Sequence, residues 1–163
     1  MALNLHESNA RAKIKTVIEA VSGIGTVHDY MRWLNNMNTL KTLFVTNSQL
    51  VGWMITMDRI RQVDEGMGGV QGSGTVHVWY EFRVIGVYSV DDSAATEKTF
   101  TTLALNVVQA LDQNTDLNSN TYGGGASSDF VSTPCESGDF GYRMFAGVLC
   151  HYVEIKKVLE ECV

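Results

Sequence analysis

With 163 residues, 45% of them hydrophobic, the chain is long enough for one domain with a sizeable core. Its formal net charge of −6, with only 12 lysines and arginines, argues against a protein that grips nucleic acid by neutralising phosphates. The three cysteines, Cys135, Cys150 and Cys162, form no CxxC pair, so neither a disulfide framework nor a cysteine zinc site is supported. The sequence shows neither a membrane span nor a signal peptide, and we expect the chain to fold in a reducing cytoplasm.

The first third of the chain alternates between helical and strand patterns. Residues 8–22 carry apolar side chains at helical spacing, which predicts a helix that ends at Gly23 and Gly25. The elements predicted after it are a short strand over 26–30, a helix over 35–45 and a strand over 50–62.

The most informative pattern is the run 75–90, in which apolar and polar residues alternate as in a half-buried strand. At roughly 3.3 Å per residue it would reach on the order of 50 Å, whereas a domain of this length has a radius of gyration of only ~15 Å. The strand must therefore bend, with Gly86 as the predicted place, or project beyond the core. The glycine-rich segment 63–74 before it predicts a mobile hairpin tip that becomes ordered on a partner.

The rest of the chain predicts one further helix and two strands. A helix over 93–113, capped by Asp92 or Ser93, carries an unbroken apolar stripe. It is followed by a polar loop over 118–128 and by strands over 130–135 and 144–159. Consecutive strands without intervening helices favour antiparallel pairing. We therefore predict one α+β domain over residues 1–163, with a mostly antiparallel sheet of about four to five strands, two to three helices on one face and a long projecting hairpin.

Histidines and cysteines are the first candidates for chemistry. His28 and Asp29 are adjacent in a predicted strand and would point to opposite faces, so a structural role is favoured over a catalytic dyad. His77 and His151 could approach if their strands pair, but two histidines without a carboxylate triad favour sheet positions over a metal site. Cys150 precedes His151 in an apolar strand, where a nucleophile is not expected.

The glycine-rich segments match no phosphate-binding motif, so flexible loops are the favoured interpretation. Glu81 and Arg83 lie two apart on one strand face and predict an ion pair, either solvated or between subunits. We therefore predict no catalytic residue, no metal and no cofactor, and a protein that is not an enzyme.

Four local patterns, taken together, point to a family. They are Gly25-x-Val27-His28-Asp29-Tyr30-x-Arg32-Trp33, then Gly52-Trp53-x-Ile55, then Asp91-Asp92-Ser93 running to Glu97-Lys98-Thr99-Phe100, and last Met144-Phe145-x-Gly147-Val148-Leu149-Cys150-His151-Tyr152. In these patterns, over nearly its whole length, the chain resembles the tail terminator (tail completion) proteins of long-tailed bacteriophages.

The resemblance implies a virion protein at the tail–neck junction, which forms a homo-oligomeric ring, commonly a hexamer. Such a ring caps the tail tube and joins it to the neck or connector below the head, and the family has no catalytic residues to transfer. DNA would pass through the lumen without specific binding, and an acidic lining would repel its phosphates.

Other functions remain open at this stage. A different neck, head-closure or tail-tube protein would carry similar patterns. A small-molecule-binding enzyme domain would need a concave site with convergent polar groups, and a monomeric adaptor would bind one partner through the hairpin.

The predicted interface residues are Arg32, Trp33, Asp64, Glu65 and Met67. The first two follow the predicted strand 26–30, and arginine and tryptophan are frequent interface anchors because they combine apolar area with directional polar contacts. The other three lie in the predicted hairpin tip.

Overall fold

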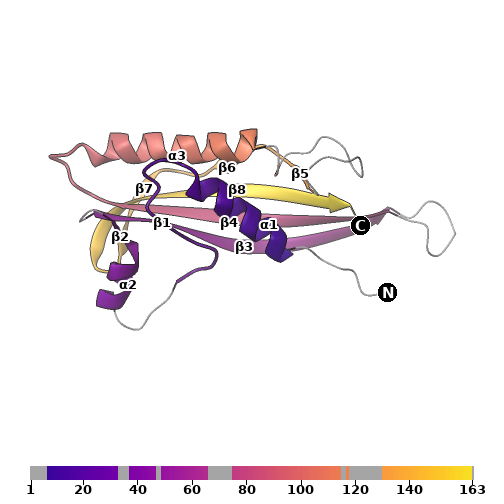
Figure 1. The fold of residues 1–163 in the computed structure, drawn as a ribbon, viewed down its shortest axis with the longest axis horizontal. Helices are drawn as coiled ribbons and strands as arrows, with labels where there is room; N and C mark the ends of the chain where they lie inside the picture. The colour runs from indigo at the N-terminus through magenta and orange to yellow at the C-terminus, as the bar shows by residue number, and fades with distance from the viewer. Residues whose placement is uncertain are drawn as a thin grey trace.

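The computed structural model describes residues 7–32, 37–46, 49–65, 75–114, 117 and 130–162. Three helices and a large sheet make up this part of the chain (Figure 1). The helices are α1 (Glu7–Glu19), α2 (Met37–Phe44) and α3 (Thr96–Gln113). The strands are β1 (Thr26–His28), β2 (Val45–Thr46), β3 (Gln49–Glu65), β4 (Thr75–Ser89), β5 (Val131–Ser132), β6 (Glu136–Ser137), β7 (Gly141–Phe145) and β8 (Val148–Cys162).

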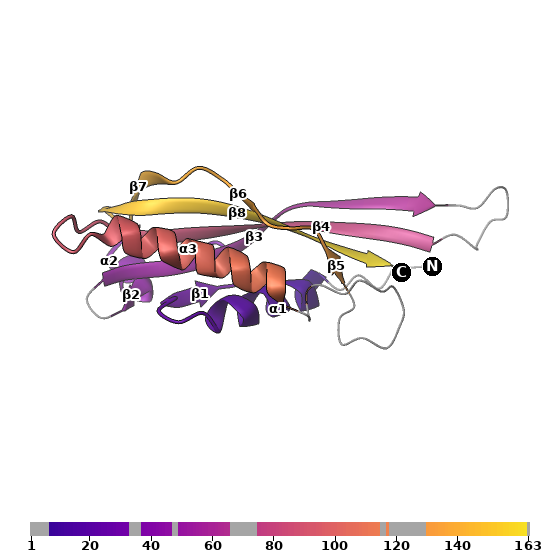
Figure 2. The same ribbon diagram turned by 90° about the horizontal axis from the view of Figure 1, so that it is seen from above.

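The sheet is built around three long neighbouring strands, β3, β4 and β8, which pair antiparallel. The short β1 adds parallel to β3, and β7, β6 and β5 pair antiparallel with successive parts of β8. Figure 2 shows the strong twist of the long strands along the molecule, as strand chirality requires. The prediction of an α+β fold with a mostly antiparallel sheet is confirmed.

The main core lies between this sheet and two helices, α1 and α3. The predicted stripe of α3 is buried through Phe100, Leu103, Ala104, Val107 and Leu111, and α1 contributes residues such as Ile14 and Ile18 to the same cluster. The remaining helix, α2, ends at Phe44. This residue belongs to a second cluster on the opposite sheet face, together with Met54 and Val87. Among the described residues, no helix is long and apolar enough to cross a membrane.

The second cluster depends on Gly52, which lies directly under the Phe44 ring. A Cβ atom at position 52 would stand 1.9 Å from Phe44 Cδ1, and Phe44 is fully buried. We expect Gly52→Ala to lower the free energy of unfolding by about 1–3 kcal/mol, the usual cost of overpacking. Urea unfolding measures this. In a Phe44→Ala background the same substitution should cost much less, and equal costs in both backgrounds would contradict the contact.

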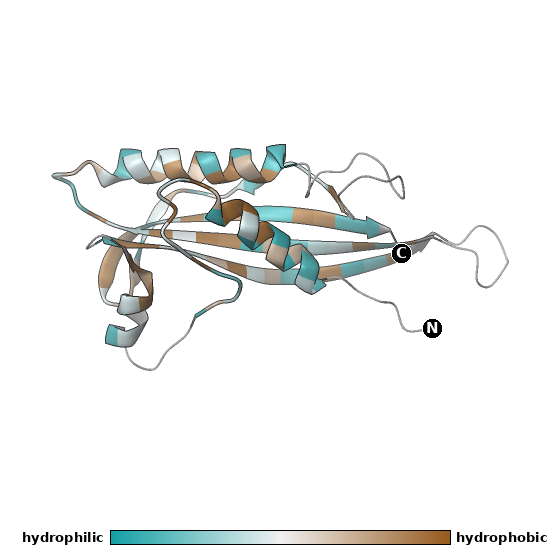
Figure 3. Ribbon diagram, viewed as in Figure 1, coloured by the Kyte–Doolittle hydropathy of each residue, from teal (hydrophilic) through white to brown (hydrophobic). Residues whose placement is uncertain are grey.

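The long hairpin of β3 and β4 projects beyond α1 and α3 (Figures 1 and 2). Figure 3 shows the strands turning from apolar to polar toward this projecting end. β3 continues to Glu65, so residues 63–65 of the predicted loop belong to a strand, and residues 66–74 lie outside the described part. Gly86 makes room for Trp53, whose ring atoms would lie 2.6–3.0 Å from an added Cβ. This close approach explains the glycine without a bend.

The start of α3 differs from its prediction. The helix begins after Ala95, which has left-handed backbone angles and caps no N–H with its side chain, so capping by Asp92 or Ser93 is wrong. The Asp91 carboxylate instead accepts hydrogen bonds from the Ser93 hydroxyl and the Ala94 N–H. This local turn uses the polar side chains before the helix can.

The single strand predicted over 144–159 is wrong, because it contains a hairpin. β7 and β8 are joined by Ala146 and Gly147, with φ of 50° and 76°. Two consecutive positive φ angles are typical of the type I′ turn of a two-residue hairpin. The strand predicted over 130–135 is shorter than expected, since β5 contains only two residues.

Candidate assembly surface

The predicted interface residues do not form one site within the subunit. Arg32 is half-buried after β1, where its guanidinium lies 4.5 Å from the Tyr30 ring and its Nε donates to His28 Nδ1 at 3.4 Å. Asp64 and Glu65 end β3 at the far, projecting end of the hairpin. The other two predicted residues, Trp33 and Met67, lie outside the described part.

The histidines are held by separate structural contacts. His77 Nδ1 lies 2.6 Å from Glu160 Oε1, whereas His151 Nε2 lies 3.0 Å from the Thr96 hydroxyl. The two histidines do not approach each other, because His151 is opposite Tyr88, at the other end of β4 from His77. Burial lowers the pKa of His151, which favours the neutral ring. The described residues contain no group of three or more side chains suited to a metal ion.

The described free cysteines are not activated nucleophiles. Burial raises the pKa of Cys150 to about 11 and that of Cys135 to about 12, so both thiols are protonated at neutral pH.

The predicted pair between Glu81 and Arg83 is wrong. Arg59 donates to both carboxylate oxygens of Glu81, at 2.8 and 3.0 Å from one nitrogen. Arg83 instead donates a hydrogen bond to Asp58 at 2.7 Å. Neighbouring strands bring side chains closer than positions i and i+2 of one strand, so cross-strand pairing prevails.

These pairs belong to a polar sheet face that the described helices leave open at the hairpin end. On this face Arg143 lies over the Tyr152 ring at 3.9 Å, and Arg61 lies over Trp79 at 4.7 Å. The cations alternate with carboxylates such as Glu154, which lies near both Arg83 and Arg143. Such an interleaved surface is not the basic groove that phosphate backbones need.

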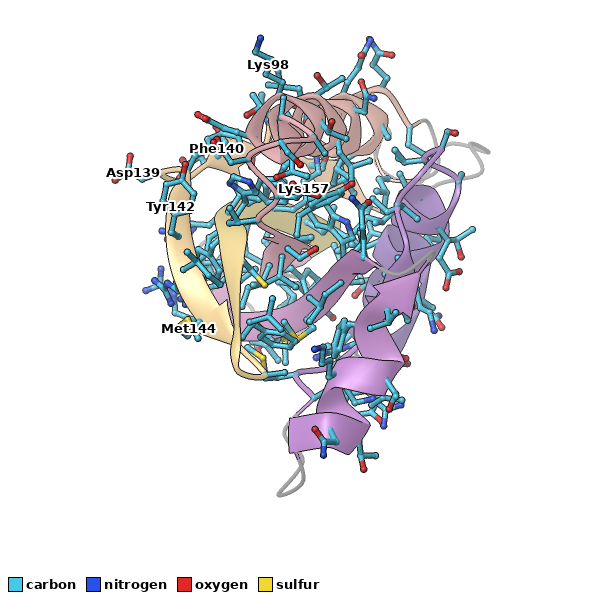
Figure 4. All side chains as sticks on the ribbon, turned by 90° about the vertical axis from the view of Figure 1, so that its left-hand side faces the viewer. Lys98, Asp139, Phe140, Tyr142, Met144 and Lys157 are labelled. Carbon is cyan, nitrogen blue, oxygen red and sulfur yellow. The ribbon has the colours of Figure 1, made fainter. Side chains whose placement is uncertain are left out.

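The clearest surface for a partner is the β7 hairpin. Its large apolar side chains are exposed, at 45% for Phe140, 58% for Tyr142, 67% for Met144 and 48% for Leu149. Figure 4 shows Phe140, Tyr142 and Met144 following one side of the molecule. Aromatic residues and methionine are enriched in protein interfaces. β7 is also the outermost strand of the sheet at this end.

Within the described part of the chain, no strand pairs with the outer edge of β7. Val90 N donates to Leu149 O, so the backbone groups of Leu149 point toward β4. Gly138 N donates to Glu154 O, so the backbone groups of Glu154 point to the other side of β8, toward β6 and β7. By antiparallel alternation, alternate residues of β7 bond to β8, beginning at Gly141. The N–H and C=O groups of Tyr142 and Met144 therefore point away from the sheet.

A second open edge lies on the opposite side of the sheet. β1 pairs with β3 only at Gly52–Met54, and no described strand pairs with the outer edge of β3 from Thr56 onward. The register shifts between Met57 and Arg59. Beyond this bulge the same alternation turns the backbone groups of Ile60 and Gln62 outward. Ile60 and Val63 are exposed at 42% and 41%.

Sequence reasoning missed the β7 surface, although a signal was present. Phe140, Tyr142 and Met144 alternate with smaller or polar residues, and a glycine at position 147 marks the turn. The strand predicted over 144–159 begins only at Met144, and Phe140 and Tyr142 belong to no predicted element.

Comparison with known protein families finds no match, and no curated protein matches the chain either.

Proposed function

We propose that this protein is a virion structural protein that forms a ring on the end of a phage tail tube and joins the tube to the neck. The observation that carries the proposal is the pair of open edges on one sheet, β7 on one side and the outer part of β3 on the other. A closed ring uses two different surfaces of each subunit, and an edge left uncovered is an aggregation hazard.

The projecting hairpin and the resemblance to tail terminator proteins support the same proposal. A hairpin that extends beyond its own core gains contacts when a neighbouring chain covers it, as in strand addition. Its exposed apolar residues, Ile60 and Val63, lie on the projecting part.

The charge distribution suits a channel that DNA crosses. The chain carries a net charge of −6, and the open sheet face mixes ion pairs such as Arg59–Glu81 and Arg83–Asp58. A wall without a basic patch would let phosphates pass without holding them.

A small-molecule enzyme is less well supported by the groove at the end of α1. This open groove of about 640 Å³ lies between the end of α1 and α3. Lys98 is the one charged residue among those that line it, so the groove offers no acid–base pair.

Deleting the gene tests the proposal. Particles made without the protein should contain heads and tails that remain unjoined, with tails of uncontrolled length. Normal virions would contradict it.

A further inference from the structure

We propose that neighbouring copies in the ring join their sheets, with β7 of one copy pairing antiparallel with the outer edge of β3 of the next. The inference rests on the proposed function and specifies the contact that closes the ring. Three features of the sheet make the two edges compatible.

The first feature is strand direction. β3, β4, β8 and β7 are four neighbouring strands, and each is antiparallel to the next. β7 therefore runs opposite to β3. Rotation about a ring axis gives every copy the same strand directions relative to that axis. β7 of one copy therefore meets β3 of the next as an antiparallel pair, and no twofold axis between the copies is needed.

The second feature is the face to which the side chains turn. The Tyr142 ring lies 5.1 Å from His151, which stacks on Phe100 of α3 at 5.8 Å, so Tyr142 is on the helix-covered face. Ile60 is opposite Tyr80, which belongs to the core on that face. Residues directly opposite in an antiparallel pair share a face. Pairing therefore keeps the helices of every copy on the same side, as a ring requires.

The third feature is the match of backbone and apolar groups. Both edges present free N–H and C=O groups at the residues whose side chains turn to the helix-covered face. Pairing would place Ile60 beside the exposed row of Phe140, Tyr142 and Met144. The free part of β3 lies at the far end from β7, so successive copies are displaced along the strands, which tilt relative to the ring axis.

Proline variants test this contact, because proline removes a backbone donor. Met144→Pro and Gln62→Pro each delete an N–H that points out of the sheet, so the subunit's own ladder is preserved. Met144→Ala and Gln62→Ala are the matched controls, since they shorten the same side chains and keep the donors. Melting temperatures and near-UV circular dichroism check the fold, and native mass spectrometry, with and without tail tube protein, measures assembly.

We expect wild type and both alanine variants to form rings, and each proline variant alone to remain monomeric. Mixed together, the two proline variants should form a one-to-one heterodimer, because one copy retains an intact β3 edge and the other an intact β7 edge. Rings formed by both proline variants would overturn the edge pairing and leave the ring itself intact. Wild type that stays monomeric even with tube protein would overturn the proposed function.

Cysteine cross-linking provides a second test that does not depend on proline. Met144→Cys is combined in turn with Ile60→Cys, Gln62→Cys and Asp64→Cys, which covers the possible registers. Opposed residues on one face are within disulfide reach. One of the double variants should form covalent oligomers on oxidation that the single variants do not. No such product from any double variant, in samples shown to contain rings, would overturn the pairing.

Discussion

Replacing Asp112 with alanine should lower the free energy of unfolding by about 3 kcal/mol, the low end of the range for breaking a buried ion pair, because the Asp112 side chain is 30% exposed. The ammonium group of Lys157 is fully buried, 2.9 Å from Asp112 Oδ1 and 3.0 Å from the Thr133 carbonyl oxygen. Asp112 also accepts a hydrogen bond from Cys135 N–H at 2.9 Å. Without the carboxylate, the buried ammonium group of Lys157 would lose the counter-charge that Asp112 supplies, which destabilises the folded state.

The controls separate charge from hydrogen bonding. Despite partial burial, hydrogen bonds from Lys157 and from the Cys135 N–H lower the pKa of Asp112, so the carboxylate is the form that stabilises the fold. Asp112→Asn keeps an oxygen acceptor for Lys157 and should cost less than Asp112→Ala. The double variant Asp112→Leu with Lys157→Met should recover much of the loss. Urea unfolding measures all three, and a loss below about 0.5 kcal/mol for Asp112→Ala would contradict the pair.

Leu103→Ala should cost about 2–5 kcal/mol of unfolding free energy, because it opens a cavity between α3 and the sheet. Leu103 is buried in the main core together with Phe100 and Val107, which lie on the same helix stripe. Leu105 on the same helix is 57% exposed and provides a matched control. Leu105→Ala should change stability by less than about 0.5 kcal/mol. Equal losses for the two variants would show that the stripe is not packed as described.

The spacing of apolar residues was enough to predict the long elements that pack one face against the core. The helix around Leu103 and the strand around Val84 show their spacing over four or more turns or alternations, so the fold class could be predicted. Local turns were harder. The hairpin turn at Ala146 and Gly147 lies between two strands that both alternate. The sequence therefore looks like one continuous strand, and the turn is not evident from it.

A buried ion pair and the open edges of the sheet both depend on tertiary contacts that no local pattern contains. Lys157 falls on an apolar strand face, and its burial is explained by Asp112, 45 residues away, together with the Thr133 carbonyl oxygen. Whether an edge is open depends on which strands pair, so the exposure of Met144 could not be predicted before the order of β4, β8 and β7 was known. The predicted residue Arg32 follows β1 and contacts His28 and Tyr30 within the subunit, and its proposed interface role remains a prediction.

The most direct test of the ring proposal is electron microscopy of the particles produced when this gene is deleted, with complementation from a plasmid. The account predicts separate filled heads and tails of uncontrolled length, and wild-type protein and Met144→Ala should restore joined virions. Met144→Pro, which removes one open edge, should fail to restore them. Joined, infectious virions of normal tail length in the absence of the gene would contradict the account.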